Sequence, residues 1–115
     1  MDKIEEFREY RKRMNEKLLA GNNKVITRIF NLDKNAYMDG ALPAKTKEML
    51  GLVSSMVLRC DDCIKYHLEK CYEHGINNEQ MHEIFAIANL IGGTIVLPHN
   101  RRAIEYWELL CQSKD

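Results

Sequence analysis

Two cysteines and a histidine in the middle of the chain have the types and the spacing of a dithiol redox site. Cys60 and Cys63 form a Cys-x-x-Cys pair, and His67 follows the second cysteine by four residues. If this stretch is helical, the three positions share one face. The Cα atoms of the two cysteines would then be about 5–6 Å apart, a separation that a disulfide accepts. The spacing therefore predicts a dithiol that can be oxidised, with an imidazole beside it.

Proton transfer to His67 is expected from Cys63 rather than from Cys60. His67 lies one helical turn from Cys63, but two turns and about 10 Å from Cys60. Both cysteines fall in the first turn of the predicted helix, where unpaired N–H groups and the helix dipole favour a thiolate. We therefore predict that His67 deprotonates Cys63, directly or through one water.

Glu48 is the fourth candidate, on the helix that precedes the cysteines. If the two helices form a hairpin that turns near Arg59, position 48 lies opposite residues 67–71. A carboxylate there can hydrogen-bond the imidazole, fix its tautomer and raise its basicity. The predicted catalytic residues are therefore Glu48, Cys60, Cys63 and His67.

Two other interpretations of the cysteine pair were weighed against redox chemistry. A Cys-x-x-Cys pair is also half of a zinc site, which His67 and Cys71 could extend. However, four ligands on three turns of one rigid helix cannot converge on a tetrahedral ion, and the chain has no second such pair. We expect no metal and no cofactor. Two buried, inert cysteines beside a core histidine remain the other alternative.

The remaining candidate residues are interpreted as structural or solvent-facing. Cys71 points inward on its helix and is interpreted as a small buried apolar group, and Cys111 as an exposed thiol. Arg101 and Arg102 are assigned to a solvated face in preference to an anionic substrate. The other histidines have no partner at a useful spacing and are interpreted as surface or capping residues: His74, His82 and His99.

Six helices must position these side chains, and the fold is predicted to be all-α. Residues 94–97 are β-branched and apolar, but a packed connector is preferred because no second strand exists to pair with them. The predicted helices span about 3–19, 24–38, 43–58, 60–75, 78–91 and 98–110, and the third and fourth form a central hairpin. The predicted buried faces include Leu52, Met56, Ile64, Leu68, Met81, Phe85, Ile91, Trp107 and Leu110, with Leu50 alongside.

Length and composition limit the class of protein. A chain of 115 residues is most simply one domain over 1–115, with a narrow amphipathic helix in 1–22 that lies on the domain's own surface or forms a subunit contact. Its 17 basic and 17 acidic residues create no overall field for nucleic acid or an anionic membrane. No apolar run could cross a bilayer, and the N-terminus is unlike a signal peptide, so we expect a cytoplasmic protein.

Glu48, the pair Cys60-x-x-Cys63 and His67 together resemble the signature of the AhpD-like alkylhydroperoxidases within the carboxymuconolactone decarboxylase family. The resemblance covers about residues 30–110. It includes the lead-in Asp39-Gly40-x-Leu42-Pro43, Gly75 after the histidine, and a helix that ends in Gly92-Gly93.

The resemblance implies an all-helical thiol oxidoreductase that forms homo-oligomers such as dimers, trimers or hexamers. Cys63 would attack a hydroperoxide, Cys60 would be the resolving thiol, and His67, oriented by Glu48, would be the general base. A lipoyl-bearing or thioredoxin-like protein would reduce the disulfide, and some members instead reduce a peroxiredoxin. The alternatives are a lactone decarboxylase of the same family and a non-catalytic helical binding protein.

One position departs from the family pattern. The best-known peroxidases of the family have a histidine just before the second cysteine, where this chain has Asp62. Asp61 and Asp62 oppose thiolate formation, although they suit a helix N-terminus. We expect Arg59 to offset part of their effect.

Overall fold

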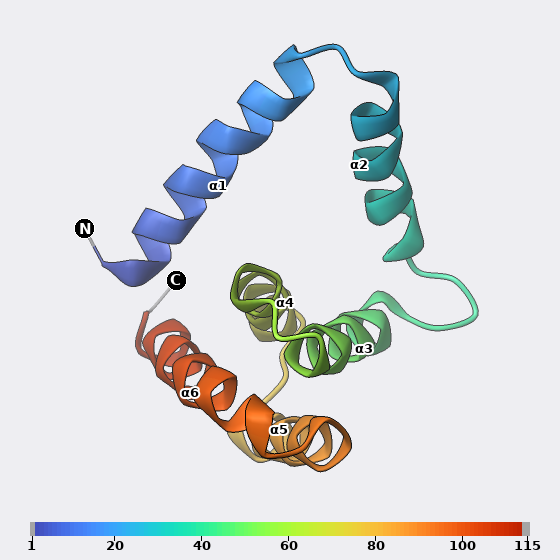
Figure 1. The fold of residues 1–115 in the computed structure, drawn as a ribbon. Coiled ribbons are helices and arrows are strands. Elements are labelled where there is room, and N and C mark those ends of the chain that lie inside the picture. Colours follow the sequence, from blue (N-terminus) through green and yellow to red (C-terminus); the bar gives the residue numbers. More distant parts are fainter. Residues whose placement is uncertain (1, 114–115) are drawn as a thin grey trace. The chain divides into compact units, whose positions relative to one another are not determined.

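The computed structural model describes residues 2–113, and every regular element in that range is helical, as the sequence predicts (Figure 1). In chain order the elements are α1 (Lys3–Ala20), α2 (Lys24–Ala36), α3 (Ala44–Val57), α4 (Asp61–Glu73), α5 (Asn78–Gly92), the short 3-10 helix η1 (Thr94–Val96) and α6 (Leu97–Gln112). The segment that could have been a strand is therefore a helical connector. Among residues 2–113, no helix combines the length and the apolar character that a membrane span needs.

The chain divides into two compact units, with the boundary between Gly40 and Ala41. The first unit contains α1 and α2, which are joined by a turn at Gly21 and Asn22. The second unit contains the other helices and all four residues of the predicted site. Whether residues 1–115 act as one domain stays a prediction.

Local capping explains where several helices begin and end. Asn23 caps α2 through its side-chain oxygen, and Asn77 and Gln80 form a capping box at the start of α5. Gly75 follows α4 with a φ of 83°, a left-handed conformation that glycine adopts without strain. Pro43 is the N-cap of α3, so this helix begins one residue later than the predicted start at position 43.

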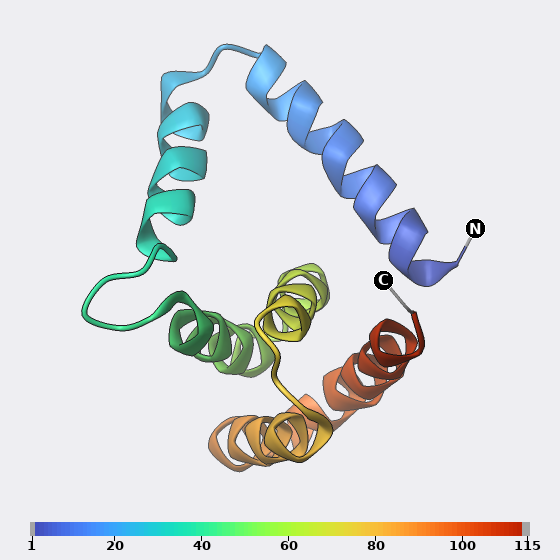
Figure 2. The same ribbon diagram turned by 180° about the vertical axis from the view of Figure 1, so that it is seen from behind.

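In the second unit, α4 packs against both α3 and α6, while α5 packs against α3 and α6 (Figures 1 and 2). The predicted α3–α4 hairpin is confirmed. The core of the second unit holds the expected apolar side chains from four helices, each almost inaccessible to water: Leu52, Met56, Ile64, Leu68, Met81, Phe85, Trp107 and Leu110.

Two side chains predicted to pack on or beside these buried faces lie in solvent instead. Leu50 on α3 is 54% exposed and Ile91 on α5 is 65% exposed. Helical periodicity places each of them near an inward-facing residue, but it does not say how wide a face the neighbouring helix covers. The part of α3 that is buried is narrower than the apolar pattern of its sequence.

Candidate active site

Cys60 lies in the tight turn from α3 into α4, just before the helix that was predicted to include it, and Cys63 lies in the first turn of α4. The N–H of Cys60 donates to the carbonyl of Ser55 at 3.0 Å, and the N–H of Arg59 donates to that of Met56 at 3.0 Å. This is the Schellman pattern that closes a helix C-terminus, and Arg59 has the left-handed φ of 61° that it requires. The same turn places Cys60 at the N-cap of α4.

Cys60 and Cys63 are joined by a disulfide, with a Cα–Cα distance of 5.3 Å. The predicted spacing of the pair is therefore confirmed. The sulfur of Cys60 also accepts a hydrogen bond from the N–H of Cys63 at 3.3 Å, as an N-cap side chain does. Cys63 is exposed and Cys60 is half-buried.

His67 and Glu48 meet in the interior of the hairpin. Nδ1 of His67 lies 2.8 Å from Oε1 of Glu48, and both side chains are buried. An ionised carboxylate only accepts hydrogen bonds, so Nδ1 of His67 carries the proton and donates it to Glu48. In a neutral imidazole this leaves Nε2 as the basic nitrogen. The contact that the sequence predicted is present, and its role in proton transfer stays a prediction.

Glu48 also affects a second residue on α4. Cys71, one turn beyond His67, is fully buried, and burial together with the negative charge of Glu48 raises its pKa to about 12. Cys71 therefore stays a neutral thiol near pH 7 and does not compete with the dithiol for oxidants. Its interpretation as a buried apolar group is confirmed, and Cys111 is exposed as predicted.

A second histidine–carboxylate pair lies at the start of α4, and the sequence analysis missed it. Nδ1 of His99 on α6 lies 2.7 Å from Oδ1 of Asp61, and Nε of Arg102 donates to Oδ2 of Asp61 at 3.0 Å. The interpretation of His99 as a surface or capping residue without a partner was therefore wrong. The i, i+3 spacing of His99 and Arg102 puts both on one helix face, which was the available signal.

The protonation state of Asp61 follows from these contacts. Burial by itself raises the pKa of Asp61, but the hydrogen bond from His99 and the charge of Arg102 outweigh it, and the pKa lies below its ordinary value. The ionised carboxylate accepts from Nδ1 of His99. Nη2 of the Arg102 guanidinium lies 3.2 Å from the same Nδ1. Because Nδ1 carries a proton, it cannot accept a hydrogen bond from Nη2, and the two groups are only in contact.

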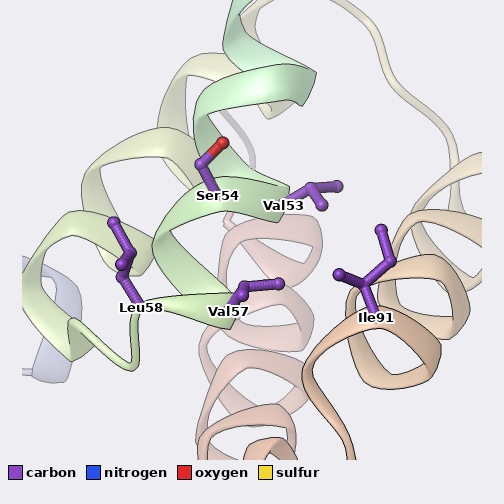
Figure 3. A pocket seen from close by; sticks show the side chains of 5 residues that line it. All are labelled: Val53, Ser54, Val57, Leu58 and Ile91. Carbon is purple, nitrogen blue, oxygen red and sulfur yellow. The ribbon is translucent and has the colours of Figure 1, made fainter.

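The described residues form an apolar groove but no cluster that could hold a metal ion. Within residues 2–113, no three His, Cys, Asp or Glu side chains are grouped so that they could hold a metal ion. An apolar groove of about 380 Å³ lies between α3 and α5 and is shown in Figure 3. Its lining consists of Val53, Ser54, Val57, Leu58 and Ile91, and it includes none of the predicted catalytic residues.

A sequence model of the carboxymuconolactone decarboxylase family matches residues 24–106, well over half of the chain. The chain belongs to this family. An uncharacterised protein of Cupriavidus necator is 32% identical over 77 residues, which are 67% of this chain and 68% of that protein.

Solved structures of the carboxymuconolactone decarboxylase family have the same fold. A Thermotoga maritima protein is 48% identical, with a TM-score of 0.90 over 93% of this chain and 94% of that one. A second crystal structure of it is described as a family protein for which an antioxidative role is suggested. A Legionella pneumophila family member at 24% identity has a TM-score of 0.87 over 97% of this chain and 100% of that chain, which shows the fold alone.

Proposed function

We propose that the protein is a thiol-dependent oxidoreductase of the alkylhydroperoxidase type, which reduces hydroperoxides through a Cys60–Cys63 disulfide cycle. The observation that carries the proposal is the buried His67–Glu48 pair, one helical turn from a cysteine pair at the N-terminus of α4. The antioxidative role suggested for the Thermotoga maritima relative agrees with it.

The proposed cycle has three steps. In the first, the thiolate of Cys63 attacks one oxygen of the hydroperoxide, the O–O bond breaks, and an alcohol leaves with the proton that the base took from the thiol. In the second, the thiol of Cys60 attacks the sulfenic acid on Cys63, which gives the disulfide and releases water. In the third, an external dithiol reduces the disulfide and becomes a disulfide itself.

His67 supplies the base in the first step. With Nδ1 donating to Glu48, Nε2 is the ring nitrogen that takes the proton of Cys63, and the carboxylate stabilises the imidazolium that forms. The dipole of α4 favours the thiolate in the same step, because Cys63 lies in the first turn of that helix. Each of these groups belongs to the second unit of the chain.

The partners and the compartment are part of the proposal. The external dithiol is a lipoyl-bearing or thioredoxin-like protein, or the reduced enzyme passes its electrons to a peroxiredoxin. We place the reaction in the cytoplasm, where thiol pairs serve as redox groups rather than as structural cross-links. We also propose that the chain works as a homo-oligomer.

The direct test counts free thiols before and after one equivalent of hydroperoxide and maps the disulfide by mass spectrometry. We expect two thiols to be lost, from Cys60 and Cys63. Cys63→Ser should abolish peroxide consumption, while Cys60→Ser should stop at a sulfenic acid that dimedone traps.

Cys111→Ser is the matched control, because it removes an exposed thiol outside the pair and should leave turnover unchanged. If Cys63→Ser and Cys60→Ser consume hydroperoxide at the rate of the parent protein, the mechanism is wrong.

A further inference from the structure

The Asp61 carboxylate is a negative charge next to a dithiol that has to ionise. Asp61 and Asp62 both lie between the two cysteines in the sequence, and a nearby negative charge raises the pKa of a thiol. Asp62 is exposed, so water and salt screen its charge. The side chain of Asp61 is only 37% exposed, so its charge is less screened. It therefore opposes ionisation of a thiol more strongly than Asp62 does, unless another group offsets it.

Two side chains on α6 contact Asp61 at the start of α4. Arg102 donates to Oδ2 through Nε, and His99 donates to Oδ1 through Nδ1, so each carboxylate oxygen has its own partner. These residues are 41 and 38 positions away in sequence. The contacts therefore depend on the packing of α6 against α4.

We propose that Arg102, acting through Asp61 and assisted by His99, is a positioning residue that offsets the carboxylate charge beside the dithiol and so keeps Cys63 able to ionise near neutral pH. The inference deepens the proposed function and rests on it, because a thiolate at Cys63 is what the peroxide step needs. The ion pair also holds the Asp61 side chain toward α6.

Other charged side chains lie on the helices packed around the start of α4 and stay unchanged in the Arg102 variants. They include Glu48 on α3, Arg59 on the turn, Asp62, Lys65 and His67 on α4, and Glu105 on α6. Arg102 and His99 are the two that a hydrogen bond joins to Asp61. Removing Arg102 while the others remain therefore isolates the ion pair.

The experiment measures the rate of iodoacetamide alkylation of Cys63 against pH in the reduced full-length protein, with Cys111→Ser as the common background. Arg102→Gln removes the positive charge that is paired with Asp61. We expect the pKa of Cys63 to rise and its alkylation near pH 7 to slow about threefold to tenfold. Arg101→Gln removes the same charge from the neighbouring position and should leave the profile within about twofold of the parent.

Two further variants separate charge from structure. Arg102→Lys keeps the positive charge and should restore most of the rate. Asp61→Asn combined with Arg102→Gln removes the carboxylate as well, and should return alkylation at least to the parent rate. If Arg102→Gln matches Arg101→Gln, or if the double variant stays as slow as Arg102→Gln, the inference is overturned.

A redox titration gives an independent readout. A stabilised thiolate favours the reduced form, so Arg102→Gln should shift the equilibrium with a dithiothreitol redox buffer toward the disulfide, and Arg101→Gln should not. Equal equilibria in the two variants would contradict the inference.

Both readouts work without peroxide turnover. If the parent fails to form the disulfide with hydroperoxide, the proposed function falls, while these profiles still decide the role of Arg102.

Discussion

Two histidines of this protein share one hydrogen-bonding pattern for the same physical reason. His67 and His99 each place Nδ1 against a carboxylate oxygen, at 2.8 Å and 2.7 Å, which fixes the proton on that nitrogen. Their surroundings differ. The His67–Glu48 pair is buried among core side chains, while Asp61 beside His99 also contacts an arginine. The first pair is therefore suited to proton transfer and the second to charge compensation.

Glu48→Gln tests the proton relay at the residue scale. The amide oxygen can still accept the Nδ1 proton of His67, so the ring keeps its orientation, but the negative charge that stabilises the imidazolium is gone. We expect alkylation of Cys63 near pH 7 to slow about tenfold, with the pH profile displaced upward. Stopped-flow alkylation at several pH values, with circular dichroism to verify the fold, measures this.

Glu69→Gln is the matched control for that variant. Glu69 is also a buried carboxylate, and its Oε2 accepts the hydroxyl proton of Tyr106 at 2.7 Å. It should alter stability without displacing the Cys63 profile. Equal profiles for Glu48→Gln, Glu69→Gln and the parent protein would remove the relay from the mechanism.

At the scale of elements, the α3–α4 turn does most of the positioning. It ends one helix with a Schellman motif and uses its next residue, Cys60, to begin the following helix. A turn this short fixes the direction of α4 relative to α3, and with it the pairing of Glu48 and His67. Its weak point is Arg59, an L-residue at a φ of 61° where most helices place glycine.

Substitutions at Arg59 should reveal this strain. Arg59→Gly removes the steric cost of the left-handed conformation, which is about 1–2 kcal/mol. Glycine also raises the conformational entropy of the unfolded chain, which lowers stability by a smaller amount. We expect the free energy of unfolding to rise by about 0.5–1 kcal/mol. A β-branched residue fits this region worst, so Arg59→Val should lower it by about 1–2 kcal/mol. Urea denaturation of the oxidised protein measures both.

His74→Ala controls for these variants, because His74 ends α4, is exposed and has an unstrained φ of −84°. It should change stability little. A glycine at position 59 that destabilises the protein by as much as valine would show that the turn is not strained at Arg59.

At the scale of the whole molecule, apolar surface remains uncovered on both units. On α2, the side chains of Val25, Ile29 and Leu32 are more than half exposed and lie along one helix face. On the second unit, the α3–α5 groove of Figure 3 is apolar, and Leu50 on α3 and Leu90 on α5 are more than half exposed. Large apolar patches mark interaction surfaces, and a formal net charge of zero causes no long-range repulsion between copies. Another copy of the chain is the proposed occupant.

Light scattering coupled to gel filtration tests this proposal. We expect the mass of a dimer, trimer or hexamer for the parent protein and a smaller species for Leu32→Glu, because a charge in a buried apolar contact is costly. Lys34→Glu lies on the opposite side of α2 and should keep the parent mass. A monomeric parent at micromolar concentration would contradict the proposal.

The sequence by itself determined the helices, their caps and the central dithiol site. These features depend on short-range spacing: Cys60 is the N-cap of α4, Cys63 and His67 lie one turn apart on it, and a hairpin of two such helices leaves Glu48 few places to lie. The family signature added the chemical roles. Periodicity, by contrast, could not tell that Leu50 and Ile91 stay exposed, since the width of a buried face is set by the neighbouring helix.

Only the tertiary structure decided the surroundings of Asp61. His99 and Arg102 reach it across about 40 residues of chain, and their contacts exist because α6 packs its face with Tyr106 and Trp107 into the unit while its first turns pass the start of α4. A helix fixes which residues share a face but not which helix that face meets. That choice is made by the packing of the whole core, which no local pattern contains.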